Sequence, residues 1–107
     1  MYIKYDYFEM LEFFENEPIS IGEDGAGEMI YSMQDDHQFK MVLMVDIYEN
    51  KIDISINYND DTIFSGEFGG VLEIRKDEDV ILIDLEGEKR LVLKKYNCLG
   101  VFMENFL

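Results

Sequence analysis

Carboxylates dominate the side chains of this sequence that could do chemistry. Asp and Glu together number 24, against nine Lys and Arg residues, and the formal net charge is −15. Two carboxylates can serve as general acid and general base, as they do in glycosidases. With so many acids in 107 residues, chance pairs are plentiful and no pair is distinguished from the rest. The sequence therefore predicts no catalytic residue, and we expect a protein that is not an enzyme.

The other reactive side chains are a single histidine, His37, and a single cysteine, Cys98. One histidine excludes His-rich metal sites and weakens triad and proton-shuttle mechanisms. We interpret His37 as an exposed turn residue; the alternative is an imidazole kept protonated by Asp35 and Asp36. We expect Cys98 to be a buried structural thiol, because the sequence offers no patterned base to activate it.

Two segments bear a superficial likeness to ligand-binding loops. Residues 22–28 contain three glycines and three acids, but a phosphate-binding loop needs backbone donors beside a cation or a helix N-terminus. Residues 57–67 lack the glycine and terminal glutamate spacing of a calcium loop. The first segment is therefore interpreted as a flexible connector, and the sequence predicts no cofactor and no defined metal site.

The strongly negative charge restricts the classes of partner. Affinity for DNA or RNA comes from cations that displace counterions, so nucleic acid is not an expected partner, and an anionic membrane surface is disfavoured likewise. The sequence has neither an apolar run of about 18 residues nor an N-terminal signal-peptide pattern, so we expect a cytoplasmic protein. The charge favours a basic protein partner, a bound cation, or simple solubility.

Local periodicity predicts the elements that hold these side chains. In residues 5–16 apolar side chains recur every 3.6 residues, which predicts one amphipathic helix. Asp6 and Glu9 resemble a capping box at its start, and Pro18 prevents it from continuing. Its apolar face is predicted to cover a sheet and consists of Tyr7, Phe8, Leu11 and Phe14 with Met10 beside them.

From Met29 onward the hydrophobic period changes to two, which is typical of strands with one buried face. Seven strands are predicted, at residues 29–34, 39–48, 52–58, 62–68, 71–75, 79–85 and 88–95. Residues 99–107 fit an eighth strand or a short helix equally well. No linker divides the chain, so we expect one domain over residues 1–107.

The expected fold is a β-rich α+β domain with one N-terminal amphipathic helix. Its strands form an antiparallel meander that becomes either a sandwich or a partly closed barrel. The side chains expected in its core are Phe8, Leu11, Phe14, Met41, Leu43, Val45, Ile52, Ile54, Ile56, Ile81 and Ile83.

The parity of a meander predicts where acidic turns gather. Alternate turns of an up-and-down meander share one end of the sheet, so the first, third and fifth turns would form an acidic rim. We predict this rim as the partner-binding site; its residues are Asp35, Asp36, Asp60, Asp61, Asp77 and Glu78. The simpler interpretation is that Asp and Asn are ordinary turn formers, because their side chains bond to nearby backbone groups.

The chain resembles the small, acidic, β-rich immunity proteins of bacterial polymorphic and contact-dependent toxin systems. The resemblance lies in the single-domain format, the aromatic helix at residues 5–15, and the strands at residues 41–48 and 51–56. It implies a cytoplasmic protein that binds a cognate toxin domain, often basic, and blocks it. The resemblance carries no catalytic residues.

The predicted function is therefore a non-enzymatic inhibitor that docks on a basic protein, steered by its acidic field and anchored by aromatic side chains. Two alternatives stay open. One is a β module whose acidic rim binds calcium or another cation, and the other is a structural or assembly subunit whose acidity keeps it soluble.

Overall fold

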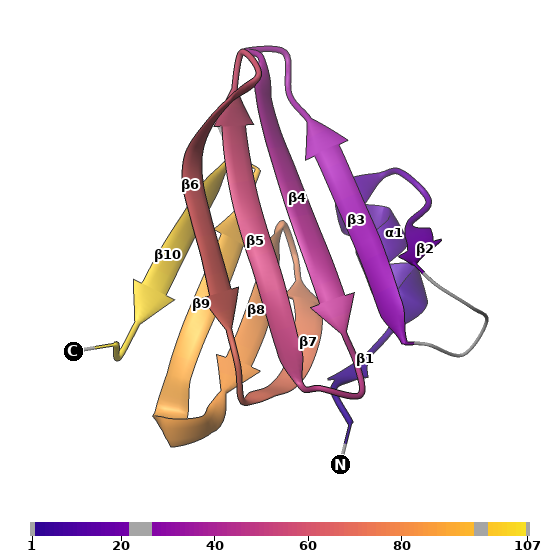
Figure 1. Ribbon diagram of the computed structural model, residues 1–107, viewed down its shortest axis with the longest axis vertical. Coiled ribbons are helices and arrows are strands. Elements are labelled where there is room, and N and C mark those ends of the chain that lie inside the picture. The colour runs from indigo at the N-terminus through magenta and orange to yellow at the C-terminus, as the bar shows by residue number, and fades with distance from the viewer. Residues whose placement is uncertain (1, 22–26, 96–98, 107) are drawn as a thin grey trace.

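The computed structural model describes residues 2–21, 27–95 and 99–106. In those residues the chain forms one short helix and two five-stranded sheets, with neither sheet closed into a barrel (Figure 1). Sheet 1 has the strand order β2-β3-β4-β5-β6, and sheet 2 has the order β1-β7-β8-β9-β10. The predicted β-rich α+β class is confirmed. Of the two expected forms, a sandwich or a partly closed barrel, the structure has two separate sheets packed on each other.

Sheet 1 is an antiparallel meander throughout. Its strands are β2 (Ile19–Ile21), β3 (Glu28–Gln34), β4 (Phe39–Asp46), β5 (Lys51–Tyr58) and β6 (Asp61–Phe68). Sheet 2 is antiparallel except for β1, which pairs parallel to β7. Its strands are β1 (Lys4–Tyr5), β7 (Val71–Asp77), β8 (Val80–Leu85), β9 (Lys89–Lys94) and β10 (Gly100–Glu104), with a short 3₁₀ turn, η1 (Glu86–Glu88), between β8 and β9.

The chain passes from sheet 1 to sheet 2 at Gly69–Gly70. Gly70 has φ +67°, a left-handed conformation that suits glycine because other residues carry a Cβ. The crossing is held against the β4–β5 turn, since the Val71 N–H donates to the Asn50 carbonyl at 2.8 Å and Asn50 Nδ2 donates back to the Val71 carbonyl at 3.3 Å. The predicted meander therefore splits here into two sheets.

The core lies between the two sheets and consists of the apolar side chains that recur at every second strand residue. Strand residues of one parity point inward from each sheet and meet in a single apolar cluster. Nine of the eleven expected core residues are buried there: Phe14, Met41, Leu43, Val45, Ile52, Ile54, Ile56, Ile81 and Ile83.

The helix α1 (Tyr7–Phe14) lies against one strand of each sheet, β3 and β7, and so covers one side of the sandwich (Figure 1). Asp6 is its N-cap, with Oδ1 accepting from the Phe8 N–H at 2.8 Å. Glu15 ends it in a left-handed conformation, with φ 59°. The predicted helix and its N-cap are confirmed, but Glu9 accepts from the Lys76 N–H at 3.0 Å, so it binds β7.

The expected buried face of the helix is wrong at three positions, one of which is the exposed Tyr7. Phe8 is 71% exposed and Leu11 is only half-buried, while the fully buried residues are Met10, Phe13 and Phe14. Both sets follow a 3.6-residue period, so the sequence offers two apolar stripes on one helix. The stripe that turns inward is the one that packs between β3 and β7, and this tertiary contact is not encoded in the periodicity.

Candidate protein-binding surface

Two of the three predicted acidic turns lie side by side at one end of sheet 1. The β3–β4 and β5–β6 turns reach the same end of the molecule (Figure 1), and the Asn59 N–H donates to the Gln38 carbonyl at 3.1 Å. Asp36, Asp60 and Asp61 are exposed there. The structure therefore brings together the carboxylates of the first and third predicted turns, and we call Asp36, Asp60 and Asp61 the sheet 1 rim.

Asp35, which belongs to the same turn, is occupied by the local fold. Its Oδ1 accepts from the backbone N–H groups of His37 and Phe39, both at 2.9 Å. Such bonds from an Asp side chain to the following backbone are the usual reason for Asp in a turn. For Asp35 the turn-former interpretation is the one that the geometry supports, and His37 is exposed, as expected.

Asp77 and Glu78 belong to the other sheet. They lie at the β7–β8 turn and border a hollow of about 450 Å³ together with Asp79, Val80 and Lys94. The parity prediction holds only while the chain stays in one meander, and the crossing at Gly69–Gly70 ends that meander. The six predicted site residues are thus divided between two sheets, four in sheet 1 and two in sheet 2.

A polar hollow connects the sheet 1 rim with the outer face of sheet 1. Its volume is about 340 Å³, and its lining comprises Gln34, Gln38, Lys40, Asn57, Asn59 and Asp60. Four of these six side chains are amides, which can both donate and accept hydrogen bonds. The Asn57 Oδ1 atom is buried without a hydrogen-bond partner in the described residues. This lining suits polar groups of a protein partner better than an apolar ligand.

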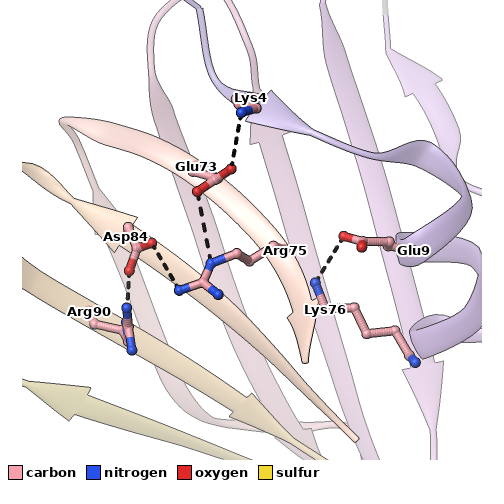
Figure 2. A network of polar contacts seen from close by, with 7 residues as sticks. All are labelled: Lys4, Glu9, Glu73, Arg75, Lys76, Asp84 and Arg90. Atoms are coloured by element: carbon pink, nitrogen blue, oxygen red, sulfur yellow. Dashed lines mark hydrogen bonds and ion pairs between the residues drawn. The ribbon is translucent and has the colours of Figure 1, made fainter. Parts of the chain in front are cut away.

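Sheet 2 carries a different arrangement of charge on its outer face (Figure 2). Arg75 lies between Glu73 and Asp84, with nitrogen–oxygen distances of 3.8 and 3.7 Å, and Arg90 Nε donates to Asp84 Oδ1 at 2.7 Å. Lys4 extends the network to Glu73 at 3.7 Å. The hydrogen bond and the charge of Asp84 raise the pKa of Arg90 above its usual value. These carboxylates are already paired with cations of the same chain.

Two further ion pairs join sheet 2 to the helix. Lys76 Nζ lies 3.7 Å from Glu12, and Lys95 Nζ lies 3.5 Å from Glu15 while donating to the Phe13 carbonyl at 2.8 Å. A cation on the last carbonyls of a helix also opposes the negative end of the helix dipole. Four of the six cations of residues 75–95, namely Arg75, Lys76, Arg90 and Lys95, are therefore paired with carboxylates of the fold.

Exposed aromatic side chains form two pairs away from the sheet 1 rim, and the exposed Tyr58 lies on β5 opposite Asp61 of the rim. Tyr2 packs edge-to-face on Tyr48 of the β4–β5 turn with ring centroids 4.8 Å apart, and Tyr7 packs on Phe8 at 5.7 Å. All four are exposed. Exposed aromatic residues of this kind are the usual anchors of protein interfaces.

The described residues contain no group of three or more His, Cys, Asp or Glu side chains that could hold a metal ion. The calcium alternative thus has no geometric support in this part of the chain. Cys98 and most of the glycine-rich connector at residues 22–28 lie outside the described residues. Within the part described, no helix has the length and apolar character needed to cross a membrane.

The described residues thus form a β-rich α+β domain of two sheets. Its one helix packs at the side of the domain, against β3 of one sheet and β7 of the other. No known protein family matches the chain, and no curated protein matches it in sequence. Among solved structures, it is similar to a chain of the contact-dependent growth inhibition toxin–immunity protein complex from Klebsiella pneumoniae 342. The TM-score is 0.81 at 18% sequence identity, over 97% of this chain and 98% of that chain.

This likeness confirms the resemblance to contact-dependent toxin systems at the level of the fold. The complex contains a toxin and an immunity protein, and this chain shares the architecture of one of its chains. Because the match spans nearly the whole of both chains, it covers both sheets and the helix together.

Proposed function

We propose that this chain is the immunity protein of a contact-dependent growth inhibition system. It binds a cognate toxin domain in the cytoplasm and blocks it without performing chemistry of its own. The observation that carries the proposal is the fold match over 97% of this chain to a chain of a toxin–immunity complex.

The immunity role fits this chain better than the toxin role for an electrostatic reason. A toxin that attacks nucleic acid or an anionic membrane has to approach a polyanion, and the chain carries a net charge of −15. An inhibitor that docks on such a toxin meets the basic surface with which the toxin binds its own target. Negative charge then accelerates encounter with the partner.

The described reactive side chains also favour a binding role. Asp84 is paired with two arginines, and Asp35 is bonded to its own turn. The backbone N–H of the single histidine, His37, donates to Asp35, and its side chain is exposed at the end of sheet 1. None of the three is arranged as a nucleophile with a base within reach, which is the arrangement that acyl or phosphoryl chemistry requires.

The test is expression of a candidate cognate toxin domain, taken from a neighbouring gene of the host, with and without this chain. We expect the toxin domain alone to stop growth of the host, and co-expression of this chain to restore it. The purified proteins should elute together in size-exclusion chromatography. Growth arrest by this chain alone would identify it as the toxin, and failure of both rescue and co-elution would overturn the proposal.

A further inference from the structure

The outer face of sheet 1 presents side chains in rows that the strand register defines. Residues opposite one another on neighbouring strands share a face, and the outer face is the one turned away from the buried Tyr31, Leu43 and Ile54. One row crosses all five strands and consists of Ile19, Ile30, Met44, Asp53 and Glu67. This row is apolar on one half and acidic on the other. In Figure 1 no other element lies in front of these strands.

The acidic half of the row is a like-charged pair. Asp53 of β5 lies directly opposite Glu67 of β6, an arrangement that destabilises a sheet. Burial raises the pKa of the Asp53 carboxyl and the charge of Glu67 raises it further, while Lys51 lowers it. The free protein thus keeps an electrostatic repulsion between the half-buried Asp53 and the exposed Glu67, which a cation placed between the two carboxylates would relieve.

A β-bulge creates this pair. Asn57 pairs with Thr62, but Ile56 pairs with Phe64, so Ile63 is the extra residue. Without the bulge the β5–β6 register would set Glu67 opposite the buried Ile52 and turn it inward. Bulges re-aim side chains in this way and are structural features in their own right. With the bulge, Phe68 takes the place opposite Ile52 and Glu67 faces outward.

In the described residues no cation forms an ion pair with Asp53 or Glu67, although the charge of Lys51 acts on Asp53. Residues 28–68 contain nine acids and two lysines, Lys40 and Lys51. The six ion pairs found among the described residues all involve cations of sheet 2 or its flanking residues; none lies in sheet 1. Sheet 1 therefore combines a partly exposed apolar row with carboxylates that lack a described ion-pair partner, and its outer face is complementary to a basic protein.

We propose that the toxin docks on the outer face of sheet 1, placing a Lys or Arg between Asp53 and Glu67 and an apolar side chain on Ile30 and Met44. This inference rests on the proposed function and names its surface. The sheet 1 rim and the polar hollow beside it extend the same surface, because the hollow joins β3, β4 and β5 to the rim. Apolar contact flanked by charge complementarity is the usual composition of a specific interface.

The first test supplies the cation from within the chain. Met44 lies opposite Asp53 on β4, so Met44→Lys puts an ammonium group beside that carboxylate and removes the apolar contact. The free variant should melt no lower than the wild type, because the repulsion is relieved. Its dissociation constant for the toxin domain should rise about tenfold or more, measured by calorimetry. Met103→Lys is the control for the added charge, since Met103 is exposed on β10 of sheet 2 and lies outside the proposed docking face.

The second test removes the acidic pair with Asp53→Asn and Glu67→Gln together. The control is Glu86→Gln with Glu88→Gln on η1, which changes the net charge by the same amount. We expect weaker binding and an unchanged or higher melting temperature for the first pair only. Equal effects of the two pairs would show that only net charge matters and would overturn the proposed surface.

The outcomes separate the two proposals. If the wild type forms no complex with the toxin domain, the immunity function itself fails. If the wild type binds and Met44→Lys binds as tightly as Met103→Lys, the function stands and the docking surface is wrong. Weakened binding on replacing Tyr48 by Ala, with Met44→Lys silent, would instead place the toxin at the Tyr2–Tyr48 end.

Discussion

Each sheet has a row of side chains that crosses its strands on the outer face. In sheet 1 the row includes Ile30, Met44, Asp53 and Glu67. In sheet 2 it includes Lys4, Glu73, Asp84 and Arg90. In sheet 2 the carboxylates lie next to cations, and Arg75 bridges two of them (Figure 2). In sheet 1 two carboxylates face each other without a cation between them. The difference lies in cation placement, since Glu73 and Asp84 have cations beside them in their own row and Asp53 and Glu67 do not.

This contrast separates charges that stabilise the fold by pairing within the chain from charges that can still pair with another protein. An ion pair between partly exposed side chains contributes modestly to folding, but it also occupies both partners. In the sheet 2 network the charges of Glu73 and Asp84 are therefore offset by cations of the same chain. Sheet 1 retains a negative field, which is the kind of surface that directs a basic partner to one face of the molecule.

The first prediction tests whether the two sheets differ in their outer faces alone. Ile54 of sheet 1 and Ile83 of sheet 2 are both fully buried in the shared core. Replacing either by Ala should lower the free energy of unfolding by about 2–5 kcal/mol, as large-to-small core changes do. Chemical denaturation measures the effect, and Phe8→Ala is the control because Phe8 is exposed. A loss below about half a kcal/mol at either isoleucine, typical of surface positions, would contradict the shared core.

The second prediction compares one chemical change on the two outer faces. Asp84→Asn removes the partner of Arg75 and Arg90 and should destabilise the protein by about 0.5–1 kcal/mol. Asp53→Asn removes a repulsion and should stabilise it by a few tenths, roughly the size of a cross-strand pair effect. The sign of the change in unfolding free energy is the readout. The same sign for both variants would contradict the contrast between the sheets.

The dependence on pH provides an independent readout of Asp53. Its pKa in the folded protein is raised above the ordinary 3.8, so the folded state holds this proton more tightly than the unfolded state does. The stability linked to Asp53 is therefore present below pH 3.8 and is lost as the pH rises through the raised pKa. The advantage of Asp53→Asn over the wild type should grow across that interval. Thermal melting as a function of pH measures it, and a constant difference would contradict the shift.

Periodicity predicted most of the fold because it reports which face of a strand is buried. The seven predicted strands correspond to β3 through β9, and the undecided C-terminal segment contains β10. β1 and β2 were not predicted, because strands of two and three residues are too short to show a period. Their places are fixed by pairing with β7 and β3, which is tertiary information.

The candidate surface was predicted less completely, for two physical reasons. Turn parity correctly grouped Asp36 with Asp60 and Asp61, but it could not foresee the passage into sheet 2 that separates Asp77 and Glu78 from them. The Asp53–Glu67 pair depends on a one-residue bulge at Ile63, and alternation along one strand does not reveal which residue of the next strand lies opposite. A count of the β5–β6 register with the bulge allowed would have found it.

The last and smallest effect concerns the sheet 1 rim. Asp36→Asn, Asp60→Asn and Asp61→Asn together remove three exposed negative charges and leave the backbone bonds of Asp35 in place. The free protein should be slightly more stable, and association with the toxin domain should slow by about two- to tenfold at low salt. The slowing should fade as ionic strength rises, because the Debye length falls from about 30 Å at 0.01 M salt to about 8 Å at 0.15 M. Stopped-flow fluorescence over a salt series measures the rate, and the comparison in sheet 2 removes the same number of exposed charges with Asp77→Asn, Glu78→Gln and Asp79→Asn. If the sheet 2 variant slows association as much as the rim variant does at every salt concentration, steering comes from the whole molecule and the rim has no special role. If the rim variant alone slows it, the field that directs the toxin originates at the end of sheet 1, next to the face on which we expect it to dock.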